Sequence, residues 1–234
     1  TNSLLTTQTD NLIFHTLDNS LKPQIEDLLA LGKAAGADLV EIFLEKSDNI
    51  SLLAEQDSIS NVSPSFGIGA GIRVFLGKKD GFVSTNDLSK DGLLFALSQA
   101  LGMLGLQIGT LFKSNFEGLT TLNDFGKYKN NWLNETPDMN ESTSKLLEST
   151  KTLSGLNKNL KVRRATYSRN WQEVLIAATD GVFARDIRLH QTVGINVIAQ
   201  EGKNRSTSAR RYGSSGNPDD LRNWNIDKSA MELN

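Results

Sequence analysis

Hydrophobic and polar residues alternate along residues 65–76, and this alternation predicts a β-strand of unusual composition. One face of the strand is apolar and consists of Ile68, Ala70, Ile72, Val74 and Leu76. The other face carries three glycines and an arginine, namely Gly67, Gly69, Gly71 and Arg73. Because glycine has no side chain, another backbone can approach this face closely. We expect contact either with an extended peptide or a partner's backbone, or with one of the first two helices.

A hairpin is predicted at the end of this strand. The pair Asp80-Gly81 is typical of a turn with positive φ, and it is followed by a second extended run over residues 82–85. The glycine spacing does not match the G-x-G-x-x-G fingerprint of dinucleotide-binding loops, and a strand rather than a helix follows it. We therefore interpret the glycines as structural and not as a phosphate-binding loop.

Three amphipathic helices are predicted from apolar residues that recur every three to four positions. The first covers residues 20–36, with a proline in its first turn and Gly36 as its stop. The second follows a capping sequence at residues 86–89 and ends or bends near Gly105. A third is predicted between residues 138 and 154.

Two strands are predicted between the first helix and the glycine strand. Residues 38–46 and 50–56 each alternate, and the polar residues 47–49 between them predict a turn. A short third pairing is expected around residues 59–62. The long segment 106–132 is rich in Gly and Asn and predicts an irregular connection.

The last third of the chain has the pattern of a β meander. Four extended runs cover residues 162–168, 171–179, 182–199 and 205–212. Turns are predicted at Asp180-Gly181 and Glu201-Gly202, and a bulge or bend at Gly194, because the third run is long for a single strand. The fold class that follows is α+β, with mixed, mainly antiparallel sheets packed against two or three helices and a C-terminal β meander.

Three parts are expected along the chain. Residues 1–20 form an N-terminal arm, and residues 21–212 form the main α/β domain. Residues 213–234 are expected to be a linker and the start of a helix that leads to an absent C-terminal domain, because Asn217-Pro218 is a strong helix start after a Gly/Ser-rich stretch.

Candidate chemistry is sparse. The chain holds two histidines, His15 and His190, and no cysteine, so a zinc site of the usual nitrogen and sulfur type is not expected within it. We predict no catalytic residue, no metal ligand and no cofactor in this chain. The sequence has neither a signal peptide pattern nor an apolar run long enough to cross a bilayer, and a cytoplasmic location without membrane contact is expected.

Charge is distributed unevenly along the chain. Between residues 158 and 211 there are eleven Lys or Arg and four Asp or Glu, although the whole chain has a net charge of −2. Such a basic region can bind nucleic acid or an acidic peptide, or its charges can lie on solvated strand edges, where they oppose aggregation. Because no nucleic-acid-binding motif accompanies the charge, the sequence favours solvated strand edges.

Several motifs together carry a resemblance to a known family. They are AAGADLVEIF at residues 34–43, SFGIGAGIRV at 65–74, DGFVST at 80–85, TDGVFARD at 179–186 and RRYG at 210–213. In order and spacing they resemble the N-terminal half of the TldD/PmbA family. The resemblance covers roughly residues 21–213 and is weakest between 106 and 160.

The resemblance implies a mixed α/β N-terminal domain of a zinc metallopeptidase that acts on small or unfolded peptides, a family also described as modulators of DNA gyrase. In TldD-type members an H-E-x-x-x-H motif lies in the C-terminal half. This chain lacks that motif, so we expect it to be inactive alone and expect zinc in the missing half.

The implied role of the chain is to form part of the peptide cleft and the interface with a like or unlike TldD/PmbA-type subunit. The expected contacts with the peptide or partner are the three glycines and Arg73 of the glycine strand. Two alternatives are a gyrase-associated or nucleic-acid-binding module that uses the basic region 158–211, and a purely structural domain.

Overall fold

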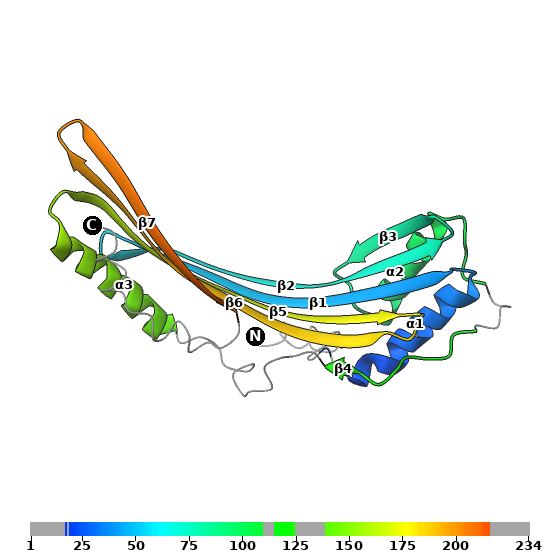
Figure 1. Cartoon of the computed structure of the whole chain (residues 1–234). Coiled ribbons are helices and arrows are strands. Elements are labelled where there is room, and N and C mark those ends of the chain that lie inside the picture. Colours follow the sequence, from blue (N-terminus) through cyan, green and yellow to red (C-terminus); the bar gives the residue numbers. More distant parts are fainter. Residues whose placement is uncertain (1–16, 18, 110–114, 125–138, 216–234) are drawn as a thin grey trace, which may run out of the picture. The chain divides into compact units, whose positions relative to one another are not determined.

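The computed structural model describes residues 17, 19–109, 115–124 and 139–215, which form an α+β fold (Figure 1). The helical elements are a short 3-10 helix η1 (Asn19–Leu21) and the α-helices α1 (Lys22–Ala34), α2 (Lys90–Gly102) and α3 (Met139–Leu156). The strands are β1 (Leu39–Glu55), β2 (Ser58–Leu76), β3 (Lys79–Thr85), β4 (Asn123–Asp124), β5 (Leu160–Ala178), β6 (Phe183–Glu201) and β7 (Asn204–Ser215). The predicted fold class is thereby confirmed.

Within these residues the strands form one sheet in the order β3-β2-β1-β5-β6-β4, with β7 paired to β6. The β2–β3 and β6–β7 pairs are antiparallel, whereas the two-residue strand β4 runs parallel to β6. Strands β5, β6 and β7 follow one another through short turns and form the predicted C-terminal meander.

The chain divides into two compact units, which are described separately. Unit 1 consists of Thr1–Lys46, Gly67–Gly126 and Glu173–Ile187, and unit 2 consists of Ser47–Phe66, Lys127–Gln172 and Arg188–Asn234. Strands β1, β2, β5 and β6 contribute residues to both units.

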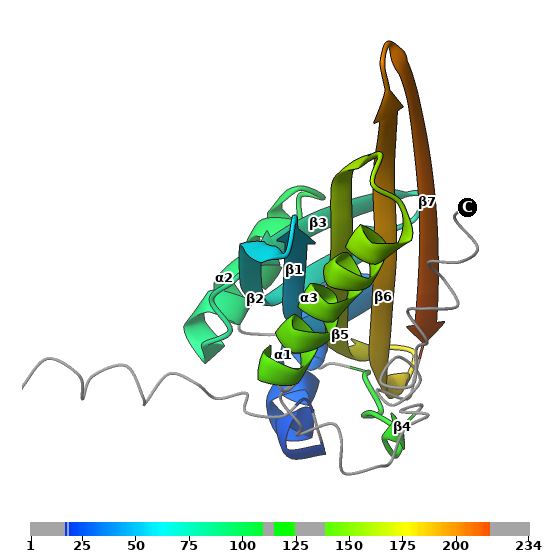
Figure 2. The same cartoon turned by 90° about the vertical axis from the view of Figure 1, so that its left-hand side faces the viewer.

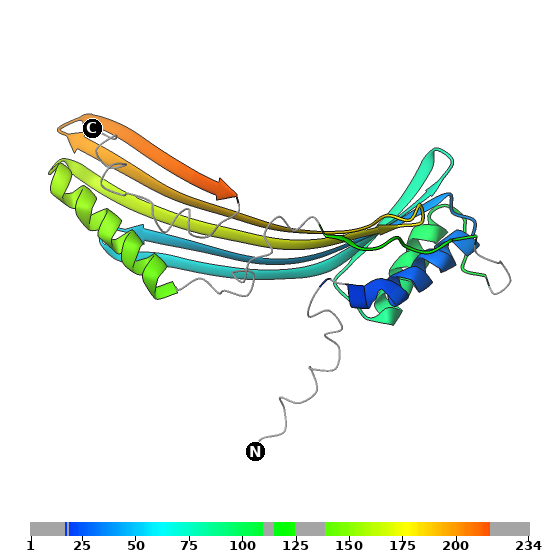
Figure 3. The same ribbon diagram turned by 60° about the horizontal axis from the view of Figure 1, so that its bottom comes forward.

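In unit 1, helices α1 and α2 cover one face of the sheet (Figure 3). Helix α1 has Pro23 in its first turn, where a missing N–H costs nothing, and it ends before Gly36, whose φ of 98° is easily reached only without a side chain. Its buried side chains pack with those of α2 and with the apolar faces of β1 and β2. Burial of these apolar side chains is the main stabilising contribution in this unit.

The start of α2 is capped as its sequence predicts. Ser89 is the N-cap, and its Oγ accepts a hydrogen bond from the Gly92 N–H at 3.1 Å. Hydrogen bonds from the side chain and backbone of Ser89 lower the pKa of the Asp87 carboxyl below its usual value. A carboxylate with a lowered pKa stabilises the fold above its unfolded-state pKa, and this stabilisation is lost as the pH falls through the folded-state pKa.

Replacing Ser89 by Ala is expected to lower the free energy of unfolding by about 1 kcal/mol, because the Gly92 N–H loses its acceptor. The substitution also removes a hydrogen bond to Asp87, so the pKa of that carboxyl should rise. Urea denaturation measures the first effect and an NMR titration of Asp87 the second. Ser98→Ala, which alters an exposed side chain within the same helix, serves as the control.

In unit 2, helix α3 packs against β5 and β6, as Figure 2 shows from the side. Leu146 contacts a cluster that includes Ala165, Tyr167 and Val193, and Leu153 contacts a second cluster with Ile195 and Val197. These two leucines are seven positions apart, which places them on one stripe of the helix. The predicted third helix is confirmed, and it is slightly longer than expected.

The strands are longer than predicted. Residues 47–49 do not form a turn but continue β1, and the predicted third pairing at 59–62 is part of the long strand β2. The runs 162–168 and 171–179 are likewise one strand, β5. Polar residues remain in these strands because neighbouring strands hydrogen-bond their backbone N–H and C=O groups. This pairing outweighs the low intrinsic preference of such residues for a strand.

The turn of the β2–β3 hairpin also differs from the prediction. Leu76 pairs with Lys79, so Gly77 and Lys78 form the turn, and Gly77 has the positive φ of 59°. Gly81 lies inside β3 opposite Val74, where its missing side chain serves another purpose described below.

The turns of the meander are confirmed, whereas the bulge is not. Gly181 and Gly202 have φ of 96° and 57° at the β5–β6 and β6–β7 turns. The β6–β7 register passes through Gly194 without an extra residue, so no bulge interrupts this ladder. His15 of the predicted arm and the predicted helix start at residue 217 lie outside the described residues, and the domain boundaries stay a prediction.

Candidate functional site

The glycine face of β2 lies opposite the helices of unit 1. Ala70, Ile72 and Val74 are buried in the core beneath α1 and α2, and the glycines and Arg73 alternate with them. The alternative that one of these two helices packs on the glycine face is therefore wrong. The glycines point to the face of the sheet that α1 and α2 leave uncovered, which we call the open face of unit 1.

The β3 strand partly fills the space above the glycines. The Phe82 ring lies over Gly71, where an added Cβ would be 3.0 Å from ring atom Cε2. At Gly69 an added Cβ would be 3.3 Å from Asn86 Oδ1 and from the Thr85 carbonyl oxygen. Both distances are tight for a side chain, so glycine at these two positions lets β3 and the segment after it lie close to β2.

Arg73 is held at the surface by neighbours on the same hairpin. Its Nε donates to Asp80 Oδ2 at 3.0 Å, and its guanidinium carbon lies 4.9 Å from the centre of the Phe75 ring. Arg73 and Phe82 are directly opposed in the β2–β3 pair, and both side chains are exposed. An exposed ion pair of this kind is weak, so a ligand can replace Asp80 as the partner of Arg73 at little cost in free energy. The exposed guanidinium is therefore accessible to a ligand.

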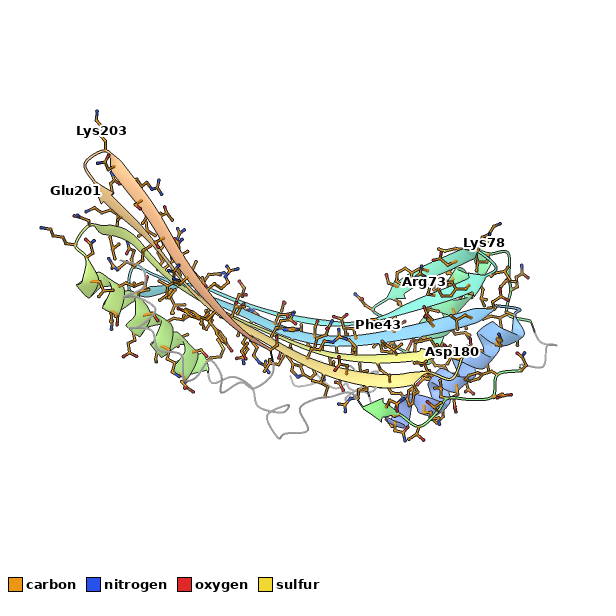
Figure 4. The ribbon with its side chains drawn as sticks, in the orientation of Figure 1. Phe43, Arg73, Lys78, Asp180, Glu201 and Lys203 are labelled. Carbon is orange, nitrogen blue, oxygen red and sulfur yellow. The ribbon has the colours of Figure 1, made fainter. Side chains whose placement is uncertain are left out.

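Apolar side chains on this face are unusually exposed for a sheet surface. Phe43, Ile176 and Phe82 have 36%, 38% and 55% of their surface accessible. Phe43 alternates with the buried residues Ile42 and Leu44 of β1, so it faces away from the helices (Figure 4). The open face thus combines exposed aromatic rings, a cation and a strip without side chains.

The glycines also lie where an edge of β2 becomes free. The pairing of β3 with β2 begins at Ala70 opposite Thr85 and continues to Leu76. Among the described residues, no strand pairs with the outer edge of β2 at Gly67 and Gly69. Unpaired backbone N–H and C=O groups at such an edge can hydrogen-bond an added extended segment.

The described residues do not fit a catalytic metal centre. No group of three or more His, Cys, Asp or Glu side chains that could hold a metal ion occurs in the part of the chain that the structure describes. His190 is exposed, and its Nδ1 lies 2.9 Å from Oγ of Ser215, the residue directly opposite it on β7. This is the arrangement of a structural surface histidine. We therefore derive no catalytic step from these residues.

A buried ion pair in unit 1 was missed by the sequence analysis. Glu173 of β5 accepts hydrogen bonds from Arg185 of β6, at 2.8 Å from Nε, and from the Leu17 backbone N–H at 3.3 Å. Its side chain is only 3% exposed. The sequence holds one indication that Glu173 is buried. In the alternating run 171–177 it lies on the same strand face as Leu175 and Ala177, which are apolar.

Comparison with protein families adds to this geometry. Residues 40–104 match the model of the PmbA/TldA metallopeptidase domain 1, and residues 133–233 match that of the PmbA/TldA metallopeptidase central domain. Together the two matches cover more than half of the chain. The chain belongs to the PmbA/TldD family. It carries the family's first and central domains, in the order that the resemblance of its motifs predicts.

Solved structures show the same fold at low sequence identity. A crystal structure from Thermotoga maritima, named a candidate modulator of a DNA gyrase, is 14% identical with a TM-score of 0.68, covering 90% of this chain and 46% of that one. One from Bacteroides thetaiotaomicron, with a similar title, is 15% identical with a TM-score of 0.68, covering 93% and 50%. TldE from Thermococcus kodakarensis is 18% identical with a TM-score of 0.64, covering 90% and 46%.

This PmbA/TldD-family chain therefore spans about half the length of the solved structures that it matches. A search of curated proteins returned no match. Among the helices that the structure describes, none has the length and apolar character needed to cross a bilayer.

Proposed function

We propose that this chain is the non-catalytic, N-terminal portion of a PmbA/TldD-type metallopeptidase that processes small or unfolded peptides in the cytoplasm. In this proposal residues 21–212 form the main domain, and residues 213–234 connect it to a C-terminal half that carries the zinc ion and the catalytic residues. The two family domains support membership in a metallopeptidase family, and the free edge of β2 beside the glycines supports peptide contact.

The proposed peptide contact follows from the chemistry of the edge. An extended peptide can add to β2 at Gly67 and Gly69 through main-chain hydrogen bonds, which do not depend on the peptide sequence. The exposed ring of Phe82 and the cation of Arg73 then lie beside it on the hairpin and can contact apolar or acidic side chains. Such a site suits an unfolded peptide, because its backbone N–H and C=O groups are free to pair with the edge.

The same edge can serve a second subunit of this family. An extended segment of a like or unlike partner would use the same hydrogen bonds, so subunit pairing and peptide binding at Gly67–Gly71 compete in this proposal.

The nucleic-acid alternative is weakened by the ion pairs of the basic region 158–211. Several of its arginines have acidic partners, among them Arg163 with Asp57, Arg164 with Glu55, Arg169 with Asp48 and Arg185 with Glu173. A guanidinium that is paired with a carboxylate is partly neutralised and has less to gain from a phosphate. The titles of two solved relatives mention DNA gyrase, but no feature of the described residues favours that partner over a peptide.

Replacing Gly69 by Val is expected to weaken the binding of an extended peptide by at least about tenfold, since the branched side chain projects from the open face beside the free edge and collides with the peptide side chain opposite it. The measurement is fluorescence anisotropy of a labelled, unstructured ten-residue peptide titrated with the purified chain. An added Cβ at Gly69 would lie 3.3 Å from Asn86 Oδ1 and the Thr85 carbonyl oxygen, so the segment after β3 has to shift slightly, and circular dichroism checks that the variant is folded.

Gly102→Ala is the matched control, because no atom lies within 4 Å of an added Cβ at that position. It should leave peptide affinity unchanged. Equal affinities for the wild type and Gly69→Val, with circular dichroism showing that both are folded, would contradict the proposed edge. Loss of zinc-dependent activity is not used as a readout, because the proposal places zinc outside this chain.

A further inference from the structure

We propose that unit 2 contains an oxyanion-binding site on strands β5, β6 and β7, centred on Gly194 and Arg211, which takes a carboxylate or phosphate group. The site is a depression of about 280 Å³ whose lining includes Thr166, Gly194, Asn196 and Arg211. This proposal goes beyond the peptide edge of unit 1 and does not depend on it, because all of its residues belong to unit 2.

The depression exists because position 194 has no side chain. Gly194 of β6 pairs with Arg211 of β7, and Thr166 of β5 lies on its other side. A Cβ added at Gly194 would be 2.8 Å from Thr166 Oγ1, closer than real Cβ atoms come to a neighbour. Glycine therefore leaves a hollow with a hydroxyl group at one wall.

Arg211 supplies the positive charge. Directly opposed residues in an antiparallel pair point to the same face, so its side chain shares the face of the hollow. Its Nε lies 3.9 Å from the position of a Cβ at Gly194. Within the described ranges the Arg211 guanidinium has no ion pair, unlike those of Arg163, Arg164 and Arg169.

The other polar groups at the hollow complement an anion. The Thr166 hydroxyl is 3.5 Å from the Gly194 carbonyl oxygen, a bond so long that the hydroxyl can turn to a ligand instead. The Asn196 amide can donate as well, and none of the described residues that line the hollow is Asp or Glu. A guanidinium with neighbouring hydroxyl and amide donors is the usual set for a carboxylate or phosphate.

The size of the site limits the ligand to a small group. A volume of about 280 Å³ is at the lower end of small-molecule pockets, enough for a free anion or for the terminal residue of a peptide. Strands β6 and β7 are joined by a turn, and Glu201 and Lys203 lie at the tip of this hairpin (Figure 4). Arg210 also lines the hollow, but it is directly opposed to Ile195, so its side chain points to the other face of the sheet. The charge on the face of Gly194 comes from Arg211.

The experiment is an NMR titration of the wild-type chain with inorganic phosphate, with N-acetylalanine and with N-acetylalanine amide. Chemical-shift changes are expected at Gly194, Thr166 and Arg211 with one or both of the anions and not with the neutral amide. If phosphate saturates the shifts and N-acetylalanine does not, the hollow is a phosphate site. If N-acetylalanine saturates them and phosphate does not, it is a carboxylate site. Saturation with both identifies a general oxyanion site.

Arg211→Gln should weaken binding by at least about tenfold, because the charged donor is lost and the side chain keeps a similar size. Arg205→Gln is the matched control, since Arg205 lies on the same strand opposite Gln200 and away from the hollow. Thr166→Val, which removes only the hydroxyl, should weaken binding by a smaller factor. The proposal is overturned if neither anion shifts these resonances, or if Arg205→Gln weakens binding as much as Arg211→Gln does.

Discussion

Replacing Glu173 by Gln is expected to lower the free energy of unfolding by about 3–5 kcal/mol, the cost typical of breaking a buried ion pair from one side. The carboxylate is 3% exposed, and the side chain of its partner Arg185 is 18% exposed, with Nη2 at 2.6 Å from Oε1. In the variant the arginine charge remains in this poorly solvated place and loses the charge of Glu173. Urea denaturation followed by circular dichroism measures the loss.

Two further variants separate the causes. Glu173→Ala should cost more than Glu173→Gln, because it also removes the acceptor of the Leu17 N–H, and Leu17 is fully buried. The double variant Glu173→Met with Arg185→Leu should recover much of the loss, because no unpaired charge is then left.

The control for Glu173 is Glu55→Gln. Glu55 also pairs with an arginine, Arg164, but both side chains are substantially exposed, so the expected loss is at most about 1 kcal/mol. A loss at Glu173 no greater than at Glu55 would show that the buried pair does not stabilise unit 1.

Replacing Gly81 by Ala is expected to destabilise unit 1 by about 1–3 kcal/mol through overpacking. An added Cβ would lie 2.4 Å from the Ala100 carbonyl oxygen and 3.2 Å from the Met103 Cβ, so the backbone of α2 has to move away from β3. The loss should be seen as a lower melting temperature.

Gly102→Ala in α2, the helix that packs on Gly81, is the control for Gly81→Ala. No atom lies within 4 Å of an added Cβ at Gly102, and alanine favours helix more than glycine does, so this variant should be neutral or slightly stabilising. Equal melting temperatures for Gly81→Ala and the wild type would mean that α2 does not rest on β3 as closely as described.

The candidate site was only partly predictable. The period-two glycines and Arg73 pointed to a strand face without side chains, and the structure confirms that they lie on one strand. Periodicity identified the apolar face of the strand but could not say which elements lie over the glycine face, because that depends on segments distant in the sequence. The ring of Phe82 over Gly71 could not be predicted either, since it depends on the register of the hairpin.

The oxyanion-binding site illustrates a different limit. Gly194 was singled out by the length of its strand and interpreted as a bulge or bend, whereas the structure shows an unbroken ladder with a hollow beside it. The hollow depends on Thr166 and Arg211 lying on either side of Gly194, and these residues are brought together only by pairing of three strands. The pattern of residues within one strand does not predict which other strands pair with it.

The sequence by itself determined the three helices, the N-cap of α2, the end of α1 before Gly36 and the glycine turns of the meander. These features depend on contacts within a few residues, such as Ser89 with Gly92 and the positive φ of Gly36, and local chemistry decides them. Only the tertiary structure decided how far each strand runs, because a polar residue such as Asp48 stays in a strand when neighbouring strands bond its backbone. It also decided that Gly81 makes room for α2 and that Glu173 meets Arg185, since contacts between distant segments leave no periodic trace in the chain.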